Sequence, residues 1–160
     1  MNILKELIPY IVIIIVVVLI RTFIVTPVQV DGSSMYPTLK NNEILILKKY
    51  DKSYSRFDIV VIDSDHGRLI KRVIGLPGET IEYKNNKLYI NGKIVKQNFK
   101  MNTKTDEFEK VKIPKNNYFV MGDNRDNSAD SRVFGTFNKK DIRGTIGIRL
   151  FPFNKIGKIK

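Results

Sequence analysis

Two adjacent serines, Ser33 and Ser34, stand in the segment GSSMYPTL, a few residues after the longest apolar run of the chain. A serine hydroxyl is a weak nucleophile until a base removes its proton, and histidine is the usual base. The single histidine, His66, lies in DSDHGR, a composition typical of an exposed turn, so we interpret it as a solvated loop residue. The chain has no cysteine, which excludes thiol catalysis, disulfides and cysteine-ligated zinc.

A lysine can replace histidine as the base if its ammonium group is desolvated, because burial disfavours the charged form and lowers the pKa. Lys71, in RLIKRVIGLPG, fits this requirement, since Leu69 and Val73 share its face of an extended strand. The neighbouring Arg72 stays charged and cannot be the base. Apolar residues occupy both faces of this strand, so a structural lysine in a salt bridge is the alternative.

A third segment, GDNRDNSADSR at residues 122–132, is dense in Asp, Asn and Ser. Such side chains bond to nearby backbone groups and fix irregular chain, so an ordinary stiff loop is one interpretation. A calcium loop is a poorer one. Asp126, Ser128 and Asp130 fit alternate ligand positions, but the glycine and the glutamate that such a loop needs are missing. We therefore expect no metal.

These segments follow a predicted transmembrane anchor at residues 7–25, which is preceded by a short tail at residues 1–6. Nineteen residues make roughly 28 Å of helix, which just spans a bilayer, and Arg21 lies close enough to its end to reach the headgroups. A cleavable signal peptide is the rival interpretation, but no small residues at A-x-A spacing follow the run. A buried core helix fits least, because the run has no polar stripe.

Residues 26–160 form the predicted catalytic domain, and their pattern is mostly β. Asn85 and Asn86 tolerate the positive φ of a two-residue hairpin loop. The polar segment 93–115 is interpreted as a lobe edge or mobile excursion. The fold predicted is a β-sheet or barrel-like assembly behind one helix. Its strands are expected at residues 43–47, 58–62, 68–74, 80–83, 87–90 and 117–121.

The net charge of +12 comes from 28 Lys and Arg residues against 16 Asp and Glu residues. An anionic partner such as lipid headgroups or nucleic acid would suit this charge. However, the lysines are scattered and form no basic block or nucleic-acid motif. We interpret them as a solvated surface and expect no nucleic-acid partner.

Four blocks occur in the order and with the internal spelling of the bacterial type I signal peptidases: GSSMYPTL, RFDIVVI, KRVIGLPGE and GDNRDNSADSR. Together with the single N-terminal anchor they cover the chain nearly end to end. The short stretch between the third and fourth blocks resembles the compact, single-anchor, Gram-positive-like members of this family. The resemblance implies a membrane-bound serine endopeptidase that removes signal peptides from exported preproteins, cutting after small residues in an A-x-A pattern.

The resemblance also implies roles for particular residues. Ser34 would be the nucleophile and Lys71 the general base, acting through an acyl-enzyme, with the Ser128 hydroxyl orienting the lysine amine. Many relatives with two anchors carry an oxyanion-binding serine where this chain has Gly32. The oxyanion would then be bound by backbone N–H groups, principally that of Ser34, with Gly32 allowing close approach of the substrate.

Further positions match the family in supporting roles. Asp123, Asp130 and Arg132 match residues that hold the site together through ion pairs. Small-residue specificity would come from shallow apolar pockets, although core side chains would look the same in the sequence. The candidate lining residues are Val30, Met35, Leu39 and Ile70.

The implied partners are signal peptides of secretory preproteins and membrane lipid, with the protein export machinery as a further candidate. No cofactor is expected, and the catalytic domain of this single-pass protein is expected on the extracytoplasmic side. Residues 148–153 (IRLFPF) could equally well contact lipid or pack on the core as a terminal strand. Two other functions stay open: a self-cleaving Ser/Lys regulatory protease, which the anchor argues against, and a catalytically silent membrane-tethered adaptor.

Overall fold

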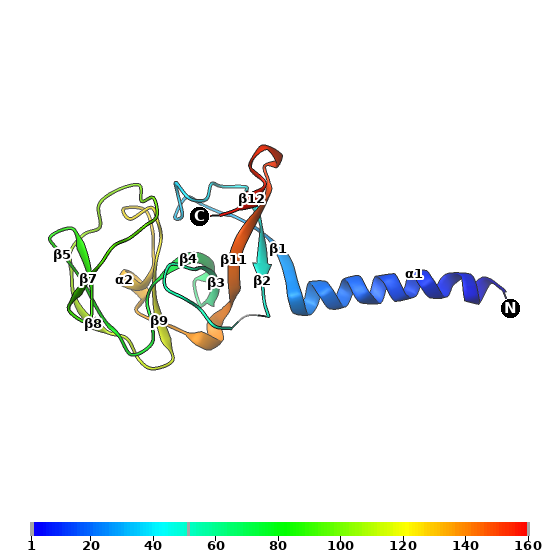
Figure 1. The fold of residues 1–160 in the computed structure, drawn as a ribbon, viewed down its shortest axis with the longest axis horizontal. Coiled ribbons are helices and arrows are strands. Elements are labelled where there is room, and N and C mark those ends of the chain that lie inside the picture. The colour runs from blue at the N-terminus through cyan, green and yellow to red at the C-terminus, as the bar shows by residue number, and fades with distance from the viewer. Residues whose placement is uncertain (1, 51, 160) are drawn as a thin grey trace.

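A long helix projects from a β-rich domain in this computed structural model, which describes residues 2–50 and 52–159 (Figure 1). The ends of the predicted tail and domain, residues 1 and 160, lie outside the described residues. The α-helix α1 (Asn2–Leu19) continues as a single π-helical turn, η1 (Ile20–Ile24). By length and composition, the stretch Lys5–Ile24 could cross a membrane, and none of it is buried in the protein. This exposure excludes the core-helix alternative.

The larger sheet has eight strands, and every neighbouring pair is antiparallel. Its main path runs β1-β2-β11-β3-β4-β9-β10, with β12 added beside β11. The bounds are β1 Val25–Gln29, β2 Ile44–Lys48, β3 Ile59–Ser64, β4 Gly67–Gly75, β9 Asn117–Met121, β10 Phe137–Asn138, β11 Ile142–Phe151 and β12 Gly157–Lys158.

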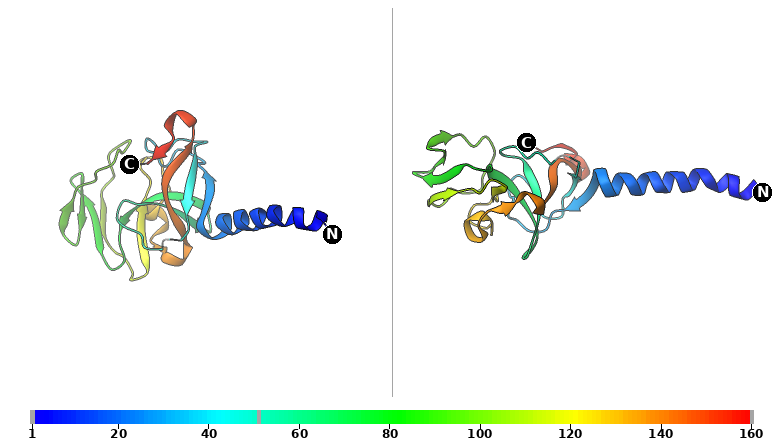
Figure 2. Two further views of the ribbon diagram at one scale, coloured as in Figure 1. Left: turned by 45° about the vertical axis from the view of Figure 1, so that its right-hand side comes forward. Right: turned by 90° about the horizontal axis from the view of Figure 1, so that it is seen from below.

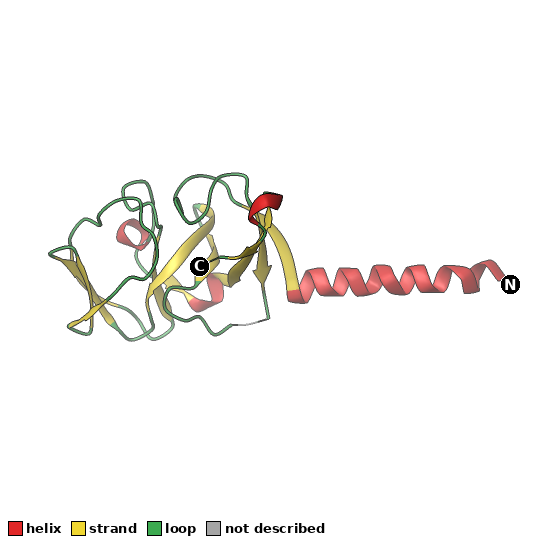
Figure 3. Ribbon diagram, turned by 45° about the horizontal axis from the view of Figure 1, so that its top comes forward, coloured by secondary structure: helices red, strands yellow, loops and turns green. Residues whose placement is uncertain are grey.

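A second sheet forms a lobe at the end of the domain that is farthest from α1 (Figures 1 and 3). Its order is β7-β6-β5-β8, and Asn85 and Asn86, with φ of 50° and 58°, make the turn that the sequence predicts between β5 and β6. Its strands are β5 Thr80–Lys84, β6 Lys87–Ile90, β7 Lys93–Val95 and β8 Phe108–Lys112. Three short helices complete the chain: α2 Ser131–Phe134, η2 Lys139–Asp141 and η3 Phe153–Lys155.

The larger sheet is buried on both faces at its middle strands, and β3 shows this most clearly. Ile59 and Val61 pack in one apolar cluster, while Val60 and Ile62 pack in another. Successive side chains of a strand point to opposite faces, so β3 must be covered on both. In its partner β4, residues 71–75 are likewise buried, whereas the first two residues of the strand are exposed.

The mostly-β fold is confirmed, with differences in detail. Of the two interpretations of the segment 93–115, the lobe edge fits the structure, because β7 and β8 are the two outer strands of the second sheet. The segment also contributes Ile113 to the core. The sequence of this segment appears polar because β7 and β8 are edge strands in which most residues are exposed. The sequence also missed β1 and most of β11. Gly144 and Gly147 lie among the register shifts that interrupt the pattern of β11.

Candidate active site

Ser34 stands in a turn whose backbone is fixed on both sides. Gly32 has a φ of +92°, which a glycine adopts without strain, and its N–H donates to Asn41 Oδ1 at 2.8 Å. After Ser34, the buried side chains of Met35 and Leu39 anchor the turn in the core. The serine hydroxyl is thus presented on the surface by a short segment that has little freedom to move.

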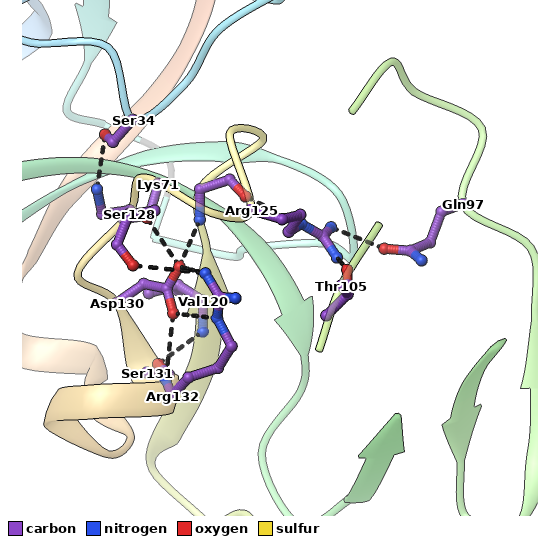
Figure 4. A network of polar contacts seen from close by, with 11 residues as sticks. Ser34, Lys71, Gln97, Thr105, Val120, Arg125, Ser128, Asp130, Ser131 and Arg132 are labelled. Carbon is purple, nitrogen blue, oxygen red and sulfur yellow. Dashed lines mark hydrogen bonds and ion pairs between the residues drawn. The ribbon is translucent and has the colours of Figure 1, made fainter. Parts of the chain in front are cut away.

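Lys71 comes from the middle of β4, between β3 and β9, and its side chain is only 3% exposed. Its Nζ lies 2.7 Å from Ser34 Oγ, within hydrogen-bond distance (Figure 4). Burial lowers the pKa of Lys71 to about 8; the charge of Asp130 opposes this shift and that of Arg132 adds to it. A substantial fraction of the amine is therefore neutral near physiological pH.

Asp130 lies beneath the lysine at the centre of a hydrogen-bond network (Figure 4). Arg132 donates to both of its carboxylate oxygens at 2.9 Å, the Gly122 N–H donates at 3.0 Å, and the Ser128 hydroxyl donates at 2.8 Å. Burial alone would raise the pKa of Asp130, but these bonds, led by those from Arg132, hold it below its usual value. Within the described chain, the Ser128 hydroxyl bonds to Asp130 and not to Lys71.

The loop after β9 clamps the serine turn directly. The Asn124 N–H donates to the Ser34 carbonyl at 3.0 Å, and the Asn124 side chain donates to the Ser33 carbonyl at 3.1 Å. Asn127 Nδ2 donates to Ser33 Oγ at 2.9 Å, so Ser33 has a structural contact of its own. A side chain at Gly122 would overlap the Ser34 carbonyl and Ser128. The sequence shows that this loop is rich in Asn and Asp. It does not show that the loop bonds to the turn that carries Ser34.

A buried ion pair joins this loop to β4. Arg72 donates to Asp123 through Nε at 2.8 Å and Nη2 at 2.6 Å, and both side chains are almost wholly buried. The Thr38 hydroxyl also donates to Asp123, at 2.5 Å, which connects the pair to the serine turn. Asp123, Asp130 and Arg132 therefore do form ion pairs. The sequence did not indicate that Arg72 is the partner of Asp123. An arginine beside Lys71 in a buried strand does, however, need a carboxylate to pair with.

Arg125 links the same loop to the second lobe (Figure 4). Its guanidinium donates to the Gly122 carbonyl at 3.0 Å, to Gln97 Oε1 at 2.8 Å and to the Thr105 hydroxyl. Burial lowers the pKa of Arg125 to about 10, at which it stays charged under physiological conditions. The polar segment between β7 and β8 is thus tied to the backbone beside the serine.

A groove of about 430 Å³ opens at Ser34, between the β1 side of the domain and β4. Val30, Met35 and Ile70 line it, as the sequence suggested, but Leu39 is wholly buried in the core and does not. Leu39 is apolar like the others, so its residue type did not distinguish it from them. It follows the serine turn directly and packs in the core. The groove is lined by Pro27, Val28, Gln29, Val30, Asp31, Gly32, Ser34, Met35, Arg68 and Ile70.

His66 lies in the exposed turn between β3 and β4, as expected. Its ring stacks on Phe134 with the centroids 4.4 Å apart. Among the described contacts none connects it to Ser34 or Lys71. The serine is therefore paired with a lysine and not with a histidine.

Comparison with known proteins shows which family the chain resembles. Residues 4–151 match the family model described as signal peptidase, peptidase S26. Signal peptidase I S of Bacillus subtilis is 47% identical over 160 residues, covering 91% of this chain and 87% of that protein, and a signal peptidase I of Bacillus amyloliquefaciens is 45% identical over 92% and 87%. A crystal structure of a signal peptidase I from Enterococcus faecalis aligns with a TM-score of 0.52 at 36% identity, covering 58% of this chain and 96% of that one.

Proposed function

Since this chain belongs to the bacterial type I signal peptidases and is a serine peptidase that removes signal peptides, we propose that Ser34 is its nucleophile and Lys71 its general base. The observation that carries the proposal is the 2.7 Å contact between Ser34 Oγ and a buried lysine amine whose pKa is lowered to about 8. A neutral amine at this distance can accept the hydroxyl proton directly.

The reaction proceeds in two halves. Ser34 Oγ bonds to the scissile carbonyl carbon as its proton moves to Lys71 Nζ, and the tetrahedral intermediate collapses when that proton passes to the leaving amine. The C–N bond breaks and an acyl-enzyme remains. The neutral lysine then takes a proton from a water molecule that attacks the ester, and returns it to Ser34 Oγ as the signal peptide leaves.

The oxyanion is bound by the backbone N–H of Ser34. The Gly32 N–H points to Asn41 and is already used. Gly32 contributes in another way: no atom lies within 4 Å of where its Cβ would be, so the substrate meets open space there. This arrangement needs no side-chain hydroxyl at position 32.

The groove accounts for cleavage after small residues. Val30, Met35 and Ile70 line the groove together with the proposed nucleophile. Their side chains leave shallow apolar space, which excludes large residues one and three positions ahead of the cut. Alanine fits both places, which is the A-x-A pattern.

The anchor brings this groove to the membrane. β1 begins at Val25, directly after η1, so the groove wall continues from the helix that holds the protein in the bilayer. We place the domain on the extracytoplasmic side, where the cleavage regions of exported preproteins emerge, within reach of the export machinery. We also propose lipid contacts at the tip formed by the end of β11 and the segment after it, where Phe151 and Phe153 are exposed. This tip lies on the side of the domain from which α1 projects (Figures 1 and 2).

The test uses the purified full chain in detergent with a preprotein that carries an A-x-A site. Ser34→Ala and Lys71→Ala proteins should each lose cleavage. Ser33→Ala is the matched control, because Ser33 is adjacent but bonds only to the loop, and it should retain cleavage, as should His66→Ala. Cleavage by both the Ser34→Ala and the Lys71→Ala proteins would refute the dyad, and loss of turnover in a folded His66→Ala protein would point to a histidine base.

A further inference from the structure

Arg68 is a charged residue on the wall of the substrate groove that the catalytic mechanism does not use. It lies on β4 two residues before Ile70, and the two side chains therefore share one face of the strand. Its side chain is about half exposed, so it is accessible to a bound peptide.

The positive charge of Arg68 is only partly compensated. Its Nε donates to Asp63 Oδ1 at 3.3 Å, a long contact, while the other oxygen of Asp63 accepts from Arg143. One carboxylate thus serves two guanidinium groups across β11, β3 and β4, which leaves a net positive charge. Asp31 is the other charged lining residue, and it lies nearer to Ser34 in the chain.

The topology fixes which part of a substrate reaches Arg68. Four antiparallel steps separate β1 from β4 in the sheet, so the two strands point the same way. Pro27 and Arg68 therefore lie toward one end of the groove, which is the end where the chain leaves the anchor, and Ser34 and Lys71 lie at the other. A signal peptide enters from the membrane and so passes Arg68 before it reaches Ser34.

Three residues of strand separate Arg68 from Lys71, or about 10 Å at 3.3 Å per residue. An extended peptide covers this distance in three residues, and the length of the arginine side chain adds about two more. We propose that Arg68 is a specificity-determining residue that reads the charge of the substrate four to six residues ahead of the cut, favouring an acidic side chain there and opposing a basic one. This inference rests on the proposed function.

The test compares three peptides that share an A-x-A site and differ only at the fifth residue ahead of the cut, which is Asp, Asn or Lys. With the full-length enzyme in uncharged detergent at low salt, we expect kcat/KM for the Asp peptide to exceed that for the Lys peptide about fivefold, as suits an exposed charge contact. The ratio of kcat/KM for the Asp peptide to that for the Lys peptide should approach one in Arg68→Ala and fall below one in Arg68→Glu. In the wild type it should decrease toward one at high salt.

Arg143→Ala is a second test, because Arg143 shares Asp63 but does not line the groove. Without Arg143 the Asp63 carboxylate pairs with Arg68 alone, so the Asp-to-Lys ratio should fall below that of the wild type but stay above that of Arg68→Ala. A wild-type ratio near one, or a ratio unchanged in both Arg68 variants, overturns the inference. The Asn peptide separates the two proposals. If the wild type cleaves it, the proposed function stands whatever the ratio, and if it does not, the proposed function itself fails.

Discussion

At the scale of single residues, the proposed chemistry depends on the protonation state of one amine. Burial lowers the pKa of Lys71 to about 8, and Asp130 works against this by attracting the charged form. Arg132 limits that opposition, because it donates to both oxygens of Asp130 and adds a positive charge near the lysine. The ion pair below the dyad therefore helps to keep the base neutral.

This balance predicts how cleavage depends on pH. Only the neutral amine is a base, so kcat/KM should fall as the pH drops through about 8, above the range of an ordinary histidine. Replacing Arg132 with Met removes a charge that lowers the lysine pKa and leaves Asp130 unpaired, so the acidic limb should move to higher pH. The measurement is kcat/KM from pH 6 to pH 10 for folded protein. An unchanged limb would show that Arg132 does not tune the lysine.

At the scale of elements, three segments distant in the sequence meet at the dyad: the serine turn, β4 and the loop after β9. The loop is bonded to the turn through Asn124 and to β4 through the Arg72–Asp123 pair. Removing one partner of such a buried pair generally costs about 3–5 kcal/mol of stability. The loop therefore acts as a clamp that sets the distance between the nucleophile and its base.

The close packing of this clamp gives a prediction at Gly122. In Gly122→Ala the added methyl group would overlap the Ser34 carbonyl and Ser128, so the loop must move away from the turn. Since a displacement of about 1 Å can cost 100-fold in rate, we expect kcat to fall about 100-fold while KM changes little. Gly147→Ala is the control, because an added Cβ there meets no atom within 4 Å, and its kcat should stay near that of the wild type. Equal rates in both variants would contradict the clamp.

At the scale of the whole molecule, we propose that the side of the domain from which α1 projects faces the membrane. The anchor enters this side, and the tip after β11 lies on it as well (Figure 2). Phe153 is 79% exposed there, which is a large apolar side chain to leave in water. The sequence left two interpretations of residues 148–153. Residues 148–151 are part of β11, as the terminal-strand interpretation expects. The side chains of Phe151 and Phe153 are nevertheless exposed, which leaves them available for contact with lipid.

If the tip enters lipid, a second point of attachment fixes the tilt of the groove over the bilayer. Phe153→Ser should then lower kcat/KM about tenfold to 100-fold for a preprotein inserted in vesicles, since burying a Phe contributes about 1.5–3 kcal/mol. Cleavage of a short soluble peptide should not change, because the tip lies outside the groove. An equal loss with both substrates would indicate a folding defect instead of a membrane contact.

The sequence by itself determined the features that depend on local pattern. The apolar run indicated a membrane-length helix, Asn85 and Asn86 indicated their hairpin, and the four sequence blocks indicated the family. The predictions of the helix and of the hairpin are correct because helix length and turn conformation depend on residues that are neighbours in the sequence. The polar pattern of 93–115 indicated a lobe edge but not the strands β7 and β8 within it, since a single edge strand carries only half of an apolar pattern.

Only the tertiary structure decided which residues are dry and which face the substrate. Leu39 and Ile70 are both apolar and cannot be distinguished by residue type. In the structure Leu39 is in the core and Ile70 lines the groove. Likewise, Lys71 could have been a surface lysine, because alternation along β4 does not say what covers each face. Burial is a property of the elements packed around a strand, and here β3, β9 and the loop after β9 remove water from the amine and place it 2.7 Å from Ser34.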